Sequence, residues 1–222
     1  MATVGFLHTA DAHVRTFSDL LAERDRRVEP RHLVDSGLHT AARRSGLEHV
    51  RPSVADRLRR LVAEGADVVV CTCSTVGPVA EEVGLELEVP VLRVDRPMAE
   101  AAVVAGRRIA VVSSLAEAAA SALPLLRECA AEAGRDVELV PVDCSGTWQA
   151  FEEGDLITYA TSVAEAVRCA VRSAEPPVDV VVLAQASMVV AAPLLRDLHV
   201  PVLTTPRLAV EAAVERVVGA AI

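Results

Sequence analysis

Two thiol and three hydroxyl groups, from Cys71 to Thr75, follow a short apolar run in residues 67–78, D-V-V-V-C-T-C-S-T-V-G-P. The three valines are typical of a buried parallel strand, and Gly77 and Pro78 indicate the start of a helix. Free N–H groups and the helix dipole favour an anion at such a helix start, and they favour a thiolate as well. This stretch therefore predicts a carboxylate- or phosphate-binding site lined by Cys73, Ser74 and Thr75.

The same pattern occurs again in residues 179–187, D-V-V-V-L-A-Q-A-S, where Gln185 corresponds to Cys73 and Ser187 to Thr75. Further blocks match in the same order, among them P-V-L at 90–92 and at 201–203. Ordered matches of this kind indicate an internal duplication. We predict a first lobe over residues 1–103 and a second over 104–205, with a last helix within 206–222 that packs back on the first lobe.

Apolar runs of strand length alternate with helical patterns along both halves. We expect strands at 3–8, 28–34, 68–70 and 89–94, and again at 109–112, 137–142, 179–184 and 200–204. We expect helices at about 12–26, from Ser53 to Gly65, 115–133, 158–174, 189–198 and 206–220, while the structure of 38–51 stays open. Alternation of this kind gives parallel sheets with right-handed crossovers, so the predicted fold is α/β with two pseudosymmetric lobes.

Ligands of such sheets bind beyond the carboxyl ends of the strands. Four strands of this chain are followed by side chains that could do chemistry there, and if the two edges face each other these side chains line one cleft. They are His8, Thr9, Cys73, Ser74, Thr75, Ser113, Ser114, Gln185 and Ser187.

Composition narrows the class of protein. Of the 222 residues 52% are hydrophobic but only 2% aromatic, which is typical of an α/β core of Ala, Val and Leu. The net charge of −9 argues against a nucleic-acid or acidic-membrane partner. No apolar run approaches the roughly 20 residues that span a bilayer. The five cysteines have no disulfide-like or zinc-like spacing, so we expect a cytoplasmic protein without a metal or other cofactor.

The motifs C-S-T-V-G-P at 73–78, L-A-Q-A-S-M at 183–188 and H-T at 8–9 resemble the aspartate/glutamate/hydantoin racemase superfamily. This resemblance implies two Rossmann-like lobes with a site between them, and cofactor-independent proton transfer at the carbon next to a carboxylate or carbonyl. In two-cysteine members one thiol from each lobe acts on opposite faces of that carbon. Cys73 matches the first of these thiols. Relatives are often dimers or larger, so a homo-oligomer is possible.

The chain departs from the two-cysteine pattern at Gln185, because an amide does no acid–base chemistry near neutral pH. A serine hydroxyl is a much weaker acid than a thiol. Single-cysteine relatives include enzymes like arylmalonate decarboxylase and maleate isomerase. We take Cys73, Ser187 and His8 as candidate catalytic residues, with His8 as a possible second acid. The candidate substrate-binding residues are Thr9, Ser74, Thr75, Ser113, Ser114 and Gln185.

Each candidate also has a purely structural interpretation. A cysteine after a strand often fills a buried space, and serine and threonine often cap helices. The primary hypothesis is an isomerase that moves a proton at the α-carbon of a small carboxylate, amino acid or hydantoin-like ring. The alternatives are a single-cysteine decarboxylase or other lyase, and a binding protein for small acids without activity.

Overall fold

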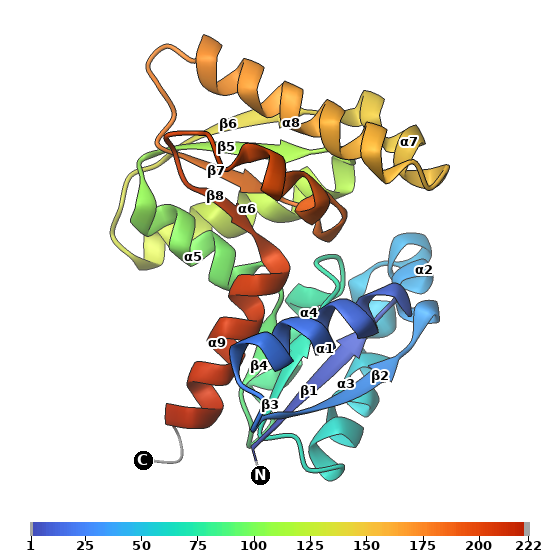
Figure 1. The fold of residues 1–222 in the computed structure, drawn as a ribbon. Coiled ribbons are helices and arrows are strands. Elements are labelled where there is room, and N and C mark those ends of the chain that lie inside the picture. The colour runs from blue at the N-terminus through green and yellow to red at the C-terminus, as the bar shows by residue number, and fades with distance from the viewer. Residues whose placement is uncertain (1, 220–222) are drawn as a thin grey trace. The chain divides into compact units, whose positions relative to one another are not determined.

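The first of two parallel sheets has the strand order β2-β1-β3-β4. The computed structural model describes residues 2–219 and is shown in Figure 1. The strands of the first sheet are β1 (Thr3–His8), β2 (Glu29–Val34), β3 (Val68–Cys71) and β4 (Val91–Arg93). The second sheet repeats this arrangement as β6-β5-β7-β8. Its strands are β5 (Arg108–Ser113), β6 (Glu138–Asp143), β7 (Val180–Leu183) and β8 (Val202–Thr204). The predicted α/β fold with two parallel sheets is confirmed.

Helices connect the strands of both sheets. In the first half they are α1 (Ala12–Arg24), α2 (Ser36–Ser45), α3 (Leu47–Ala63), α4 (Gly77–Gly84) and α5 (Arg96–Ala105). In the second half they are α6 (Ala116–Glu132), the 3₁₀ turn η1 (Ser145–Thr147), α7 (Trp148–Glu152), α8 (Leu156–Ser173), the 3₁₀ segment η2 (Ala186–Leu195) and α9 (Thr205–Gly219).

The described residues form two compact units, one from residues up to 94 together with those from 206, and one from residues 95–205. The lobe boundary predicted from the sequence falls after residue 103, whereas α5 packs against α6 and the second sheet and so lies in the second unit. The buried residues Met98, Ala102 and Val103 form the packed face of α5. Helix α9 lies in the first unit.

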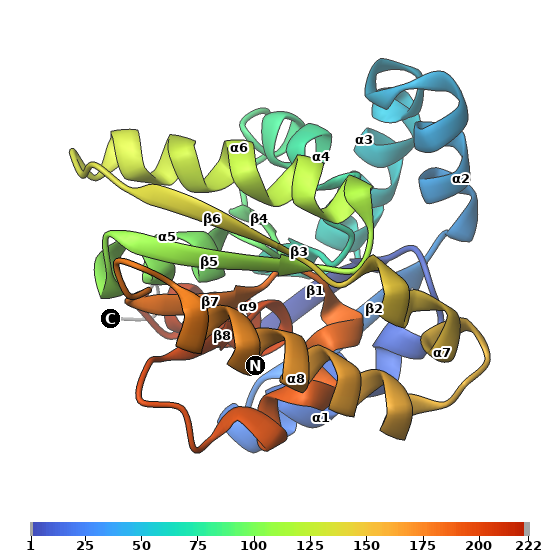
Figure 2. The ribbon, with the colours of Figure 1, turned by 90° about the horizontal axis from the view of Figure 1, so that it is seen from above.

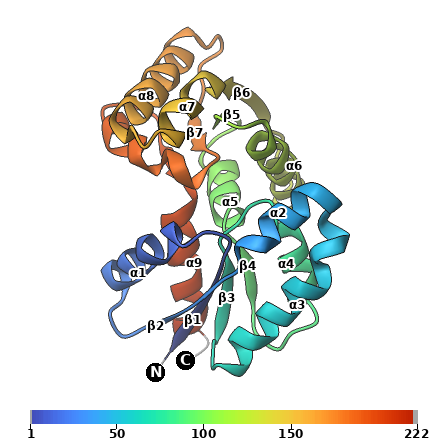
Figure 3. The same ribbon diagram turned by 90° about the vertical axis from the view of Figure 1, so that its right-hand side faces the viewer.

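Strand alternation divides the core of the first lobe between the two faces of its sheet. Phe6 and Val70 pack with residues of α1 and α9 on one face. Leu7 and Cys71 pack with residues of α3 and α4 on the other. Figure 3 shows α1 and α9 on one side of the sheet and α3 and α4 on the other. All residues of β1 and β3 are buried, as expected for central strands covered on both faces.

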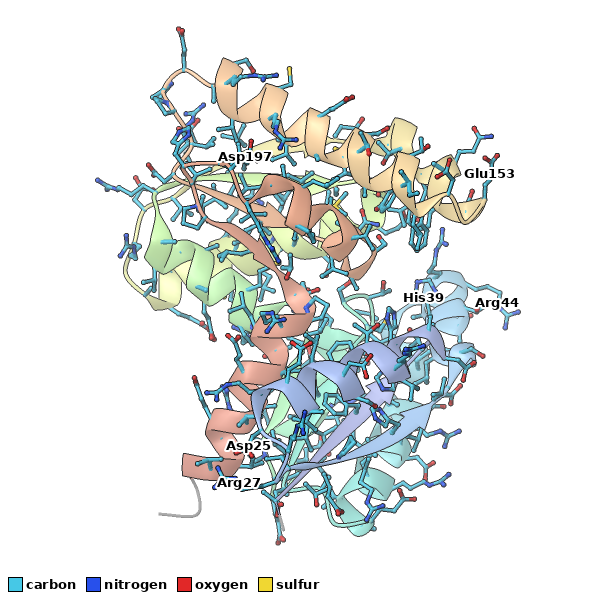
Figure 4. The ribbon with its side chains drawn as sticks, in the orientation of Figure 1. Asp25, Arg27, His39, Arg44, Glu153 and Asp197 are labelled. Atoms are coloured by element: carbon cyan, nitrogen blue, oxygen red, sulfur yellow. The ribbon has the colours of Figure 1, made fainter. Side chains whose placement is uncertain are left out.

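The second lobe has the same layers. Val112, Val181 and Leu183 form a core with the buried faces of α8 and η2. Helices α6 and α8 cover opposite faces of the sheet (Figure 2). The side chain of Arg168 on α8 donates to the Asp197 carboxylate at 2.7 Å, which fixes the end of η2 to α8. Asp197 is labelled in Figure 4. Figure 4 also labels Asp25 and Arg27 of the first lobe, which form an ion pair of 2.7 Å after α1.

The structure corrects two helix predictions, one in its start and one in its type. The prediction that Ser53 caps a helix is wrong, because α3 begins at Leu47 and contains Ser53 in its interior. Gly46, with φ of 87°, separates α3 from α2, a conformation that favours glycine. The segment predicted as a helix at 189–198 is instead the 3₁₀ segment η2. Pro193 lies inside it and has no N–H for an α-helical hydrogen bond.

The aspartate that opens each D-V-V-V motif ties the neighbouring strand in place. The Asp67 carboxylate accepts a hydrogen bond of 2.8 Å from the Thr3 N–H. The Asp179 carboxylate accepts two bonds of 2.8 Å, from the N–H groups of Arg107 and Arg108. These N–H donors, Arg108 first, lower the pKa of Asp179 below its ordinary value of 3.8. The motif thus fixes where the central strands of each sheet begin.

We predict that Asp179→Ala lowers the free energy of unfolding by about 1–2 kcal/mol, the usual net value of lost hydrogen bonds to a charged acceptor. Because the folded-state pKa of Asp179 is lowered, its contribution is present above about pH 3.8 and is lost as the pH falls through the folded-state value. Urea unfolding at pH 7 and pH 3 measures both effects. Asp136→Ala, at an exposed carboxylate of the same lobe, is the control. Equal losses in the two variants would contradict the assignment.

Candidate active site

Cys73 lies just after β3, in the turn that leads into α4. Its backbone carbonyl accepts a hydrogen bond of 2.8 Å from the Gly77 N–H, which joins this turn to the first residue of the helix. The Cys71 thiol, which is buried in the core, donates weakly to the same carbonyl at 3.8 Å. The Cys73 side chain is 9% exposed and packs at the rim of the core formed with α3 and α4. Strand and helix together hold the thiol in one place.

A buried arginine beside this turn was missed by the sequence analysis. Arg93, the last residue of β4, pairs in register with Cys71 and is 5% exposed. A Cβ atom at Gly77 would lie 3.0 Å from the Arg93 Cβ and 3.4 Å from its Nε, so glycine makes room for the arginine at the start of α4. The sequence contained one indication of this residue, an arginine at the end of a short apolar strand.

Ser74 and Thr75 are half-buried in the same turn as Cys73. The N-cap residue of α4, Val76, makes no side-chain hydrogen bond to the helix, and Pro78 stands in the first turn, where a missing N–H costs nothing. Thr9 is half-buried just after β1. The structure therefore places the thiol and two of the predicted hydroxyl groups within one turn of chain at the carboxyl end of β3.

His8 belongs to a buried chain of hydrogen bonds on the sheet face that carries Phe6. Its Nδ1 lies 2.8 Å from the Thr72 Oγ1, and its Nε2 lies 2.8 Å from Nδ1 of His32. The His32 Nε2 in turn lies 2.8 Å from the Ser18 Oγ. This chain is satisfied with both rings neutral, since each ring then donates through one nitrogen and accepts through the other.

Burial above all, and then the neighbouring His32 and His13, lower the pKa of His8 from 6.5 to about 3. The ring is 0% exposed and stacks against Phe6 with centroids 5.9 Å apart. His8 is therefore neutral near pH 7, and both of its nitrogens are engaged inside the lobe. Its bond to Thr72 holds the backbone next to Cys73, so we do not include His8 among the groups proposed below to transfer protons.

We predict that this histidine chain makes the first lobe sensitive to acid. Because the folded-state pKa of His8 is lowered, the stabilisation is present above the unfolded value of 6.5 and is lost as the pH falls towards about 3. The loss between pH 7 and pH 5 is about 2 kcal/mol. Thermal unfolding should show a smaller drop in Tm over this range for His8→Asn than for the wild type. His49→Asn, at an exposed histidine of α3, should keep the wild-type drop, and an unchanged drop in His8→Asn would refute the assignment.

In the second lobe, the Gln185 side chain occupies the N-terminus of α6. Its Oε1 accepts hydrogen bonds from the backbone N–H groups of Ser114, at 2.5 Å, and Leu115, at 3.1 Å. It also accepts from the Ser114 hydroxyl at 3.1 Å. Ser114 is a predicted substrate-binding residue, but in this structure its N–H and its hydroxyl both donate to the Gln185 amide oxygen.

Tyr159 joins two of the predicted hydroxyl residues. Its hydroxyl oxygen lies 3.1 Å from the Ser114 Oγ and 3.0 Å from the Ser187 Oγ. Tyr159 is 0% exposed on α8 and packs against Phe151, which stacks on Trp148. Ser114, Gln185, Ser187 and Tyr159 thus form one polar cluster at the carboxyl edge of the second sheet.

Two further residues lie at this edge. Ser113 ends β5 and is buried, and alternation along the strand turns its side chain to the face opposite that of Ser114. Thr205, which the sequence analysis did not single out, follows β8, and its hydroxyl is buried without a hydrogen-bond partner among the described residues. The sequence contained one indication of Thr205: two threonines follow V-L at 202–203, whereas R-V follows the matching V-L at 91–92 in the first half.

Residues 2–219 hold no group of three side chains suited to a metal ion, and none of their helices combines the length and apolar character that a membrane crossing requires. The chemistry available in the described residues is therefore that of one thiol near a helix start in the first lobe, and of an amide with three hydroxyl groups in the second.

The fold is that of amino-acid and hydantoin racemases: the chain aligns with the aspartate racemase homologue of Pyrococcus horikoshii OT3 at 14% identity and a TM-score of 0.73, over 97% of this chain and 98% of that one. It aligns with allantoin racemase of Pseudomonas fluorescens at 18% identity and a TM-score of 0.63, over 99% of this chain and 92% of that one. It aligns with glutamate racemase of Aquifex pyrophilus at 20% identity and a TM-score of 0.62, over 95% of this chain and 82% of that one.

The sequence model of the Asp/Glu/Hydantoin racemase family matches residues 9–213. The chain therefore belongs to the Asp/Glu/Hydantoin racemase family, which confirms the resemblance stated from its motifs. No curated protein matches the sequence. The likeness to the solved structures, all at 20% identity or less, shows the fold alone.

Proposed function

We propose that this protein is a cofactor-independent isomerase that moves a proton at the carbon α to a carboxylate or carbonyl group, with Cys73 as the proton-transfer residue. Membership of the racemase family supports the reaction class. The observation that carries the residue assignment is the placement of Cys73, whose turn is bonded to the start of α4 and lies beside the buried Arg93. The substrates in view are small carboxylates, amino acids and hydantoin-like rings.

In the proposed reaction the Cys73 thiolate takes the α-proton, and the electron pair of the broken C–H bond moves into the adjacent carbonyl as an enolate. Fixed hydrogen-bond donors stabilise the enolate charge, and such stabilisation commonly contributes more to the rate than any other effect. Ser74 and Thr75, half-buried in the turn before α4, are our candidates for donors of this kind. Return of a proton from the Cys73 thiol to the same face of the enolate gives exchange with retention. Delivery of a proton from water to the opposite face gives the isomerised product.

We predict that Cys73→Ser lowers the rate of α-proton exchange in D₂O at least 100-fold, the scale of acid–base catalysis by one group. NMR with a panel of amino acids and hydantoins measures the rate, and circular dichroism verifies the fold. Cys169→Ser, at the exposed cysteine of α8, is the matched control and should exchange at the wild-type rate. An active Cys73→Ser variant would exclude the thiol as the proton-transfer group.

The second candidate function is a single-cysteine lyase, and the observation that favours it is Gln185 at the position matched to Cys73. In a decarboxylation the C–C bond to one carboxylate breaks, carbon dioxide leaves, and its bonding electrons form an enolate. The Cys73 thiol then donates a proton to one face of that enolate. One acid is sufficient for this sequence, so no second thiol is needed.

Incubation with α-substituted malonates distinguishes the two functions. The isomerase predicts loss of the α-proton signal in D₂O without release of carbon dioxide. The lyase predicts carbon dioxide release that depends on Cys73 and gives a single enantiomer of the product. Chiral chromatography and carbon dioxide detection on the same sample separate these outcomes.

A further inference from the structure

The turn that carries Cys73 is held at both of its ends. At its start the chain leaves β3 after Cys71, whose carbonyl accepts a hydrogen bond of 3.0 Å from the Val94 N–H at the end of β4. At its other end the Gly77 N–H donates to the Cys73 carbonyl at 2.8 Å. The position of the thiol therefore depends on what keeps the start of α4 against the sheet.

Arg93 connects these two ends. It pairs in register with Cys71, and this pairing fixes its backbone to β3. Its side chain lies against the start of α4, because a Cβ atom at Gly77 would lie 3.0 Å from the Arg93 Cβ, 3.4 Å from its Nε and 3.9 Å from its Cδ. Arg93 is 5% exposed and Gly77 is buried as well, so the two residues pack closely.

The contacts form a closed ring of four links within the first lobe. The links are the chain from Cys71 to Cys73, the hydrogen bond to Gly77, the packing on Arg93 and the strand pairing back to Cys71. We propose that Arg93 is a positioning residue for Cys73: its stem packs on Gly77 and holds the start of α4, and with it the thiol, in one place. Only the consequence for proton transfer rests on the proposed function.

The second lobe has other side chains at both places of this contact. Val189 stands at the place of Gly77, and Thr204 stands at the place of Arg93. Thr204 pairs with β7 as Arg93 pairs with β3, so the scaffold is the same and the side chains differ. The contact between glycine and arginine thus belongs to the lobe that carries the thiol, as expected if it serves Cys73.

A methyl group at Gly77 tests this contact. It would overlap the Arg93 stem, whose backbone is held by β3, so the start of α4 has to move by a few tenths of an ångström. The Cys73 carbonyl is bonded to this helix start and moves with it. Gly5→Ala is the matched control, because its added Cβ also meets its nearest atom at 3.0 Å, on Ala66, but within β1 and not at the turn after β3.

The readout is the rate at which iodoacetamide alkylates Cys73 in the folded protein. Mass spectrometry follows this rate with the exposed Cys169 as internal standard, and circular dichroism verifies the fold of each variant. Cys73 is 9% exposed and packs in the core that includes α4, so a displaced helix start uncovers it. We expect Gly77→Ala to raise the alkylation rate roughly 3-fold or more, since cysteine reactivity follows exposure. Gly5→Ala should keep the wild-type rate although its Tm falls.

Two variants of Arg93 separate its stem from its charge. Arg93→Ala and Arg93→Met both lose the guanidinium group, but methionine keeps an unbranched side chain that can lie against Gly77. We expect Arg93→Ala to raise the alkylation rate of Cys73 and Arg93→Met to keep it near the wild-type value. With a substrate that the wild type exchanges, Gly77→Ala and Arg93→Ala should lower kcat about 10-fold with little change in KM, because a small misplacement of a reacting group is costly.

Three results would each overturn the proposal: unchanged alkylation of Cys73 in Gly77→Ala, an equal rise in Gly5→Ala, or equal rates in Arg93→Ala and Arg93→Met. Alkylation needs no substrate, so it decides the positioning role by itself. Absence of α-proton exchange in the wild type would instead contradict the proposed function, and the two failures are therefore distinguishable.

Discussion

The arrangement of both lobes depends on the hydrogen bonds that pair the two central strands of each sheet. The pairing continues one residue past each strand: the Thr72 N–H donates to the Leu7 carbonyl, and the Ala184 N–H donates to the Val112 carbonyl, both at 2.9 Å. Beyond this last bond the chain leaves the sheet and delivers its next side chain, Cys73 in one lobe and Gln185 in the other. In open parallel sheets, ligands bind at this edge.

The two lobes use the same scaffold for different chemistry. In the first, the turn after β3 carries a thiol, and the backbone of that residue is bonded to the first residue of α4. In the second, the side chain that replaces the thiol reaches over to α6 and satisfies the donors there. In our proposal only the first copy of the duplicated fold carries the acid–base chemistry. This division accounts for a family member with a single thiol at the matched positions.

The fold was predictable because its signals are local and occur twice. The D-V-V-V runs, the alternation of strands with helices and the ordered repeat indicated two parallel sheets, which the structure has. The start of α3 was missed because Gly46, and not the capping type Ser53, separates it from α2. Segment η2 was taken for an α-helix because its apolar run gives no sign of 3₁₀ geometry, although Pro193 weakens it.

The candidate site was predictable only in part. The motif placed Cys73, Ser74 and Thr75 in one turn, since neighbours in sequence stay neighbours in space. The partners of His8 lie on other elements, His32 on β2 and Ser18 on α1, and no spacing in the sequence reveals that they meet. The contacts of Gln185 with Ser114 and of Tyr159 with Ser187 likewise depend on tertiary packing. Their types were visible from the sequence, but their hydrogen-bond directions were not.

The central claim is that one thiol, Cys73, carries the proton chemistry. The most direct measurement is the stereochemical course of exchange in D₂O, with each enantiomer of a substrate followed separately by NMR and chiral chromatography. Because only one face of the carbon meets a thiol, the account predicts that one enantiomer exchanges its α-proton with retention, and that this exchange is faster than inversion. The other enantiomer should not exchange its α-proton. Equal exchange of both enantiomers at the rate of inversion would require a second acid–base group of similar strength and would contradict the account.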